Sequence, residues 1–225
     1  MTIVFGIWPY VALTVFVVGH VWRWRYDQYG WTTRTSELME KRWLLWASPI
    51  FHVGVLFAAV GHFLGLVIPA SATTALGVSE HAYHLVALGG GIFAGTLLLV
   101  GFVLLMVRRF VAQSRLRLVT VRADIVMYVL VGVVAVLGMT ATVGWSLFGG
   151  GYDYRATVAV WFRSVFWLHP QVDLMAAAPL IFQLHGALAF GVFAVWPFTR
   201  LVHLWSIPLA YFVRPPIVYQ AAAAR

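Results

Sequence analysis

The sequence predicts an all-α integral membrane protein, a bundle of five transmembrane helices with its N-terminus outside the cell and its C-terminus in the cytoplasm. Composition is the first observation that predicts this class. Apolar residues make up 62% of the 225 residues and charged residues only 10%, whereas soluble domains are about a quarter charged. The second observation is that the apolar segments are continuous. They lack the period-2 alternation of a membrane β-barrel strand, so helical spans are expected.

Five segments reach the roughly 20 apolar residues that a helix needs to cross the hydrocarbon core. They are residues 3–22, 46–69, 84–107, 125–148 and 174–199. The first four contain no charged residue, and Asp173 and Arg200 flank the fifth. No repeat or long linker separates the spans, so residues 1–225 are expected to form a single transmembrane domain. The short aromatic segment 157–168 is expected to form a helix in the membrane interface.

The basic residues predict the orientation of the bundle. Thirteen of the fifteen lysines and arginines fall in the first and third connections and after the fifth span, whereas Arg155 and Arg163 lie on the other side. Cytoplasmic loops carry an excess of basic residues, so the thirteen are expected in the cytoplasm. The connection 23–43 and the tail 206–225 then face the cytoplasm, and the connection 149–173 lies outside. The net charge of +8 is read as a topology signal, and no nucleic-acid partner is expected.

The chain contains no cysteine, which restricts the metal chemistry open to it. Disulfides, thiolate zinc sites, protein-bound iron–sulfur clusters and the attachment motif of c-type haem all need cysteine. Any metal site must therefore use histidine or oxygen ligands. There are eight histidines, and four of them lie within or beside two of the spans.

These four histidines pair by depth. His52 and His62 lie on the second span, and His185 and His203 lie on and just after the fifth. Because the two spans run in opposite directions, His52 and His203 are expected near the cytoplasmic face, and His62 and His185 toward the outer face. One imidazole pair at each of two depths suits two bis-histidine b haems, which carry electrons because both axial positions of the iron are filled. The pair separations along the chain are unequal, a difference that tilted helices, inclined haems and a break at Pro197 could absorb.

Four glycines accompany the histidines and are candidate cofactor-binding residues. Gly54, Gly61, Gly65 and Gly186 remove side-chain bulk where a flat macrocycle must approach the backbone. The alternative explanation is that small residues are common wherever transmembrane helices pack together.

Four stretches identify a resemblance: GHVWRWRYDQYGWTTRTSELME, FHVGVLFAAVGHFLG, FQLHGALAFGVFAVWPFTRLVHLWSIP and FGGGYDYRATVAVWFRS. Together they resemble the gamma subunit of respiratory nitrate reductase, a membrane cytochrome b, over nearly the whole chain. The resemblance implies five transmembrane helices and two b haems. It places the iron ligands of the cytoplasmic-side haem at His52 and His203, and those of the outer-side haem at His62 and His185.

The resemblance also implies an activity and partners. Quinol, either menaquinol or ubiquinol, would be oxidised near the outer face of a prokaryotic cell membrane, with release of its protons there. Electrons would pass inward through both haems to an iron–sulfur beta subunit. They would end at the molybdenum cofactor of an alpha subunit, where nitrate is reduced to nitrite. The connection 23–43 and the tail 206–225 would be the docking surfaces for the beta subunit.

His81 and His84, at the outer end of the third span, are the candidate proton acceptors for quinol. Some members of the family carry a lysine in the outer loop before this span, and this sequence has none there. Imidazole titrates in the range that proton transfer from quinol requires. The alternative is that the two histidines, with Glu80, form an ordinary interfacial polar cluster.

Other functions stay open at this point. The same kind of cytochrome b would also suit a nitrite oxidoreductase or a complex related to sulfite or heterodisulfide reductases. A histidine-lined membrane transporter is a different class of function, but no predicted span contains the carboxylate that such routes commonly use. A purely structural anchor would leave the pairing of the histidines unexplained.

Overall fold

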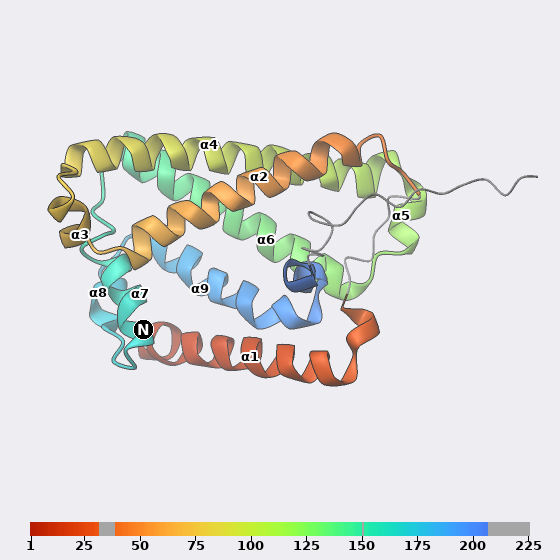
Figure 1. Ribbon diagram of the computed structural model, residues 1–225, viewed down its shortest axis with the longest axis horizontal. Coiled ribbons are helices and arrows are strands. Elements are labelled where there is room, and N and C mark those ends of the chain that lie inside the picture. The colour runs from red at the N-terminus through yellow and green to blue at the C-terminus, as the bar shows by residue number, and fades with distance from the viewer. Residues whose placement is uncertain (32–38, 150, 207–225) are drawn as a thin grey trace, which may run out of the picture.

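The computed structural model describes residues 1–31, 39–149 and 151–206. Within them, five helices are long and apolar enough to cross a membrane, as predicted, and no strand occurs. These helices run along the long axis of the molecule (Figure 1). They expose many large apolar side chains, such as Leu56, Val86 and Val129, each more than half exposed. Such a surface suits contact with lipid.

The five long helices are α-helices that continue into a turn of π- or 3-10 helix. They are η1 (Ile3–Ile7) with α1 (Trp8–Tyr26), α2 (Leu44–His62) with η3 (Phe63–Val67), α4 (Glu80–Val107) with η4 (Arg108–Ala112), α6 (Arg122–Thr140) with η5 (Ala141–Phe148), and α9 (Leu180–Val195) with η6 (Trp196–Phe198). The shorter elements are η2 (Gln28–Gly30), α3 (Ala70–Ala75), α5 (Ser114–Leu118), α7 (Val158–Phe166), α8 (Val172–Ala176) and η7 (Arg200–Ser206).

Two helix starts differ from the prediction by four residues or more. The third span begins earlier, at Glu80, because the Ser79 hydroxyl accepts a hydrogen bond from the Ala82 N–H and caps the helix. The fifth span begins later, at Leu180, and the predicted start at residue 174 lies inside the separate short helix α8. Pro179 is the cause, since the residue before a proline is disfavoured in a helix whereas a helix can start directly after one.

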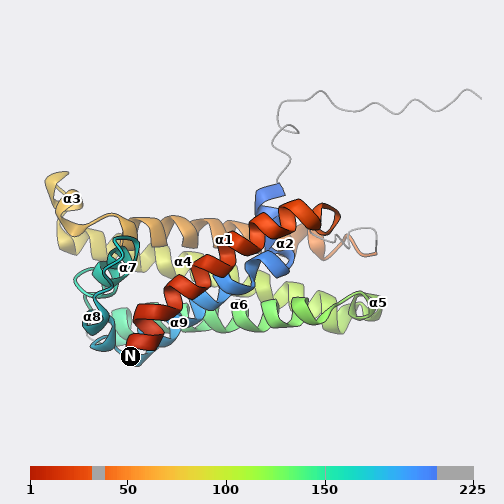
Figure 2. The ribbon, with the colours of Figure 1, turned by 90° about the horizontal axis from the view of Figure 1, so that it is seen from below.

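The long helices pack in the order α1, α9, α6, α4, α2, so that the two halves of the chain meet where α9 packs on α1 and where α6 packs on α4. Figures 1 and 2 show α1 and α2 on opposite sides of α9. The tightest crossing joins α2 and α4. A Cβ on Gly54 would collide with the backbone of Leu98, and one on Gly101 would collide with the backbone of Phe51. Glycine at both positions therefore lets the two helix backbones touch.

The connections gather at two ends of the molecule. We call the end that carries α3, α7, α8 and the N-terminus the outer end, and the end that carries η2, α5 and η7 the inner end (Figures 1 and 2). The outer end holds a packed core that includes Phe5, Trp161 and Met175. There the Trp161 indole donates a hydrogen bond of 2.9 Å to the Phe5 carbonyl. The predicted aromatic helix over 157–168 is present as α7.

Candidate functional site

The structure brings the four histidines together in two pairs. His52 of α2 faces His203 of η7 at the inner end, with ring centroids 5.9 Å apart and ring planes at 74°. His62, the last residue of α2, faces His185 of α9 nearer the outer end, with centroids also 5.9 Å apart and planes at 20°. Each pair therefore joins α2 to the α9 side of the bundle. These are the pairs expected from depth along the spans.

All four imidazoles are oriented by their Nδ1 atoms. Nδ1 of each ring lies within hydrogen-bond distance of a backbone carbonyl: Ser48 at 2.8 Å from His52, Ala58 at 2.7 Å from His62, Val134 at 3.0 Å from His185, and Arg200 at 2.6 Å from His203. A carbonyl can only accept, so Nδ1 carries the proton in each ring. The lone pair is then on Nε2. This arrangement is typical of metal-ligating histidines, whose second nitrogen is tied to a carbonyl or carboxylate.

The spacing of the pairs fits two axial ligands of one metal ion. Metal–imidazole bonds of about 2 Å on either side of an ion place the two ring centroids about 6 Å apart. His52 and His62 are also exposed, although both lie on a span. A polar side chain inside a membrane is costly unless something binds it. The donor set and its geometry therefore fit a bis-histidine haem at each pair.

A break near Pro197, one of the three ways in which the unequal spacings could be absorbed, is present and contributes to the equal pair distances. Helix α9 ends at Val195, Pro197 lies in η6, and Thr199 has an extended backbone (φ −120°, ψ −177°). The next segment, η7, turns across the direction of α9 (Figure 2). Arg23 of α1 holds this corner, because its guanidinium donates to the carbonyls of Pro197 and Thr199 at 2.5 and 3.3 Å.

The four candidate glycines have different surroundings. A Cβ on Gly61 would meet no described atom within 4 Å, whereas one on Gly65 would lie 3.0 Å from the Tyr154 hydroxyl. Gly54 faces the α4 backbone, and a Cβ on Gly186 would lie 2.8 Å from Met175 of α8. Helix packing thus accounts for Gly54 and Gly186. The open side of Gly61, next to His62, suits the approach of a macrocycle.

Helix α6 touches the site at two points that the sequence did not suggest. The ring of His185 lies directly over Gly138, where a Cβ would be 2.9 Å from Cε1 of the imidazole. Asp124, in the first turn of α6, forms a two-point ion pair with Arg200, with both N···O distances 2.6 Å. Arg200 supplies the carbonyl that His203 binds. A glycine in an apolar helix and an aspartate near a helix start carry no distinctive sequence signal.

His20 has partners that exclude it from the ligand set. Its Nδ1 donates to the Phe16 carbonyl at 2.6 Å, and its Nε2 accepts a hydrogen bond of 3.1 Å from the Trp205 indole. Both ring nitrogens are therefore used. His81 and His84 lie on the exposed surface at the start of α4, so both are accessible from the outer end.

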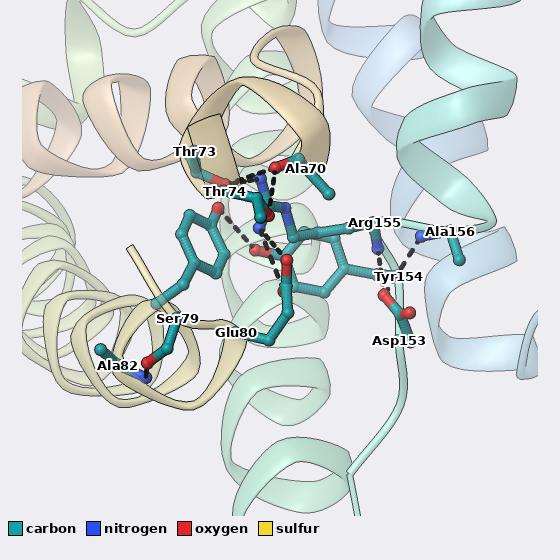
Figure 3. A network of polar contacts seen from close by, with 11 residues as sticks. Ala70, Thr73, Thr74, Ser79, Glu80, Ala82, Asp153, Tyr154, Arg155 and Ala156 are labelled. Atoms are coloured by element: carbon teal, nitrogen blue, oxygen red, sulfur yellow. Dashed lines mark hydrogen bonds and ion pairs between the residues drawn. The ribbon is translucent and has the colours of Figure 1, made fainter. Parts of the chain in front are cut away.

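A polar network at the outer end lies beside these two histidines (Figure 3). Arg155 is buried and forms an ion pair of 3.2 Å with Glu80, while its guanidinium lies 3.7 Å above the ring of Tyr83. It also donates to the hydroxyl of Thr73 at 2.9 Å. The hydroxyls of Tyr83 and Tyr154 are 3.3 Å apart, and both lie close to Gly65. The network therefore connects the exposed carboxylate of Glu80 with the region just beyond His62.

The hydroxyl of Tyr154 in this network stays protonated. Burial raises the pKa of Tyr154 well above its ordinary value, and the hydrogen bond with Tyr83 raises it further. A buried phenol next to another phenol is a hydrogen-bond donor or a relay, and it is a poor base. The role of His81 and His84 as proton acceptors stays a prediction.

The inner end carries buried ion pairs next to the predicted docking surface. Arg108 at the end of α4 donates to Glu40 at 2.6 Å, with both side chains less than a tenth exposed. This pair ties the connection before α2 to α4. Residues 32–38 of that connection and residues 207–225 of the tail lie outside the described residues. Docking of a beta subunit there stays a prediction.

The fold and the site define a class of helical bundle, with helices long and apolar enough to span a membrane and two histidine pairs, one between α2 and α9 and one between α2 and η7. A family model described as nitrate reductase gamma subunit matches residues 1–222. The chain belongs to this family.

Individual relatives are similar over most of this chain. It is 41% identical to the nitrate reductase gamma chain of Bacillus subtilis, over 97% of both chains. It is 33% identical to the respiratory nitrate reductase 1 gamma chain of Escherichia coli, over 98% of this chain and 96% of that one. It is 50% identical to the nitrate reductase-like protein NarX of Mycobacterium tuberculosis, over 95% of this chain. There the match spans only 33% of the relative's length.

Proposed function

We propose that the protein is the quinol-oxidising cytochrome b subunit of a respiratory nitrate reductase in a prokaryotic cell membrane. The observation that carries the proposal is the pair geometry: two facing imidazole pairs, in which Nδ1 of each ring binds a backbone carbonyl and the lone pair that a metal ion would bind is on Nε2. His52 and His203 would hold one b haem, and His62 and His185 the other. When bound, bis-histidine haem supplies one-electron transfer without an open site for oxygen.

The residues at the outer end suit the proton chemistry of quinol oxidation. Quinol loses two electrons and two protons on becoming quinone. Imidazole nitrogens of His81 and His84 can accept the hydroxyl protons, and the exposed carboxylate of Glu80 can pass them to water. Arg155, whose guanidinium lies over the ring of Tyr83, forms an ion pair with Glu80 at the start of α4. The electrons leave in the other direction, toward the inner pair.

The inner end suits delivery of electrons to soluble partners. It carries the basic residues that predict a cytoplasmic location, including Arg108, Arg109, Arg115 and Arg117. An iron–sulfur beta subunit docked there would receive the electrons and pass them to a molybdenum-containing alpha subunit that reduces nitrate. The relatives named as nitrate reductase gamma chains in two bacteria support this choice of partner.

The test uses membranes that contain the assembled complex. A pyridine haemochrome spectrum should give two b haems per chain, and quinol should reduce them and drive nitrate reduction. If haem b is present but the co-purifying subunits act on nitrite or on a heterodisulfide, the chain is the cytochrome subunit of another enzyme. Absence of haem b would overturn the proposal and favour a histidine-lined transporter.

The proton acceptors are tested separately. His84→Ala, alone and with His81→Ala, should slow the reduction of haem by quinol by roughly 10²-fold, the usual contribution of a general base. His169→Ala is the matched control, because His169 is another exposed histidine at the outer end. Electron delivery from an artificial donor should be unchanged in all three variants. Wild-type rates with quinol in the double variant would show that another group accepts the protons.

A further inference from the structure

We infer that α6, which carries no histidine, positions both histidines on the α9 side: Gly138 sets the place of His185, and the ion pair of Asp124 with Arg200 sets the place of His203. These are positioning residues, because they act through the imidazoles that would bind the haems. The inference rests on the proposed function only where it assumes that the histidines hold haem.

The two histidines of α2 differ from their partners in how they are held. Nδ1 of His52 and of His62 each bind the carbonyl four residues earlier in α2 itself, at Ser48 and Ala58. Their orientation is therefore set within one helix. Nδ1 of His185 instead binds the carbonyl of Val134, on a different helix. The direction of its ring depends on how closely α9 approaches α6.

Gly138 allows that close approach. It lies one helical turn after Val134, and its missing Cβ would sit 2.9 Å from Cε1 and 3.4 Å from Nδ1 of the His185 ring. A side chain at position 138 must therefore push the ring away from the Val134 carbonyl. The displacement would move Nε2 relative to His62 across the pair. Gly138 thus sets the distance and tilt of the outer pair.

At the other end of α6, Asp124 acts through Arg200. The carboxylate is almost completely buried and accepts hydrogen bonds of 2.6 Å from both Nε and Nη2 of Arg200. It also accepts a hydrogen bond from the Val121 N–H, which fixes it at the start of α6. The backbone carbonyl of Arg200 then accepts a hydrogen bond from Nδ1 of His203, with an N···O distance of 2.6 Å. The side chain of Arg200 is anchored to α6 while its backbone orients the ligand.

His203 needs such an anchor more than its partners do. It lies in η7, a seven-residue 3-10 segment after a break in the helix, whereas the other three histidines lie in α-helices. Short 3-10 segments have weaker hydrogen-bond geometry than α-helices and do not hold a direction by themselves. Removing one partner of a buried ion pair leaves the other charge uncompensated and is strongly destabilising locally. Loss of the Asp124 charge should therefore displace η7.

The two contacts lie at opposite ends of α6, so each variant should affect one pair. Gly138→Ala should at least halve the content of the outer haem, or shift its midpoint potential and its low-spin EPR signal, while the inner haem keeps its own. Gly132→Ala is the matched control, since Gly132 lies on the same helix but faces Phe102 of α4 at 3.0 Å. Gly138→Ala with both signals and both potentials of wild type would overturn this half of the inference.

Asp124→Asn should have the converse effect, with loss or shift of the inner haem signal and an unchanged outer haem. Asp124→Glu, which keeps the charge, should restore the inner signal at least in part. The unchanged outer haem serves as the internal measure of folded protein. An Asp124→Asn protein with a wild-type inner haem would overturn the second half. Wild-type protein without haem b would instead defeat the proposed function, so the two failures are distinct.

Discussion

The nitrogen atom that each imidazole turns toward the protein decides what its other nitrogen can do. In all four paired histidines Nδ1 binds a backbone carbonyl, which no protonation change at a side chain can remove. His20 shows the contrast, since the indole of Trp205 occupies its Nε2. The same residue type is therefore a candidate ligand at four positions and a structural hydrogen-bond partner at a fifth.

Single substitutions should remove the haems pair by pair. His52→Ala and His203→Ala should each abolish the same haem, and His62→Ala and His185→Ala should each abolish the other, because one imidazole cannot fill both axial positions. The measurement is the haem content per chain together with the two low-spin EPR signals. These signals should be separate in wild-type protein, since the ring planes of the two pairs differ, at 74° and 20°. If His52→Ala and His185→Ala removed one shared haem, the pairing would be refuted.

Glu40 should make the stability of the inner end depend on pH. Burial alone would raise the pKa of its carboxyl, but hydrogen bonds from the Trp43 N–H and from Arg108 outweigh burial and hold the pKa below its ordinary value. A lowered pKa stabilises the folded state above the unfolded pKa of a glutamate, about 4.3. This stabilisation is lost as the pH falls below that value toward the folded pKa.

The comparison that isolates this effect is Glu40→Gln, measured by thermal unfolding in detergent at pH 7 and at successive values down to pH 3.5. The wild type should be the more stable protein at pH 7, and the difference should shrink as the pH falls below about 4.3. Asp27→Asn is a suitable control, because Asp27 is about half exposed and its pair with Arg23 is therefore weak. An unchanged difference across the whole range would contradict the assignment.

At the scale of elements, the crossing of α2 over α4 is the contact that fixes the direction of the ligand-bearing helix. Gly54→Ala should destabilise the protein by roughly 1–3 kcal/mol, because its Cβ would meet the backbone of Leu98 and backbone yields less readily than a side chain. Thermal unfolding in detergent measures the loss. Gly89→Ala on α4 is the control, since its Cβ would meet no described atom within 4 Å. Equal stabilities for the two variants would show that α2 and α4 shift to accommodate the added methyl group without loss of stability.

The elements also show what a sequence can and cannot predict. The five spans follow from the length of the apolar segments, which the thickness of the bilayer sets. The pairing of His52 with His203 follows from the alternating direction of successive spans, which the order of the chain sets. The start of α9 was misplaced, because a run that includes residues 174–179 is apolar whether or not Pro179 separates two helices. Gly138 and Asp124 were missed because their roles depend on how α6 is rotated against α9. That rotation is decided by packing and leaves no periodic signal.

At the scale of the whole molecule, the grouping of connections at two ends makes the orientation testable. Single cysteines can be placed in a chain that has none, at Ala156 in the connection before α7 and at Ser114 at the start of α5, both exposed. An impermeant thiol reagent on intact cells should label Ala156→Cys and spare Ser114→Cys, because the basic residues concentrate at the inner end. Permeabilised cells provide the control for reactivity. The reverse labelling pattern would show that the bundle has the opposite orientation in the membrane.

The order of synthesis decides when each histidine pair can form. Both members on α2 are synthesised early, whereas His185 and His203 come from the last helix and the segment after it. A nascent chain therefore presents only half of each ligand pair until α9 and η7 have emerged and packed. If the pairs hold haem as proposed, stable insertion would be among the last events of biogenesis, and a chain truncated before α9 should contain no haem.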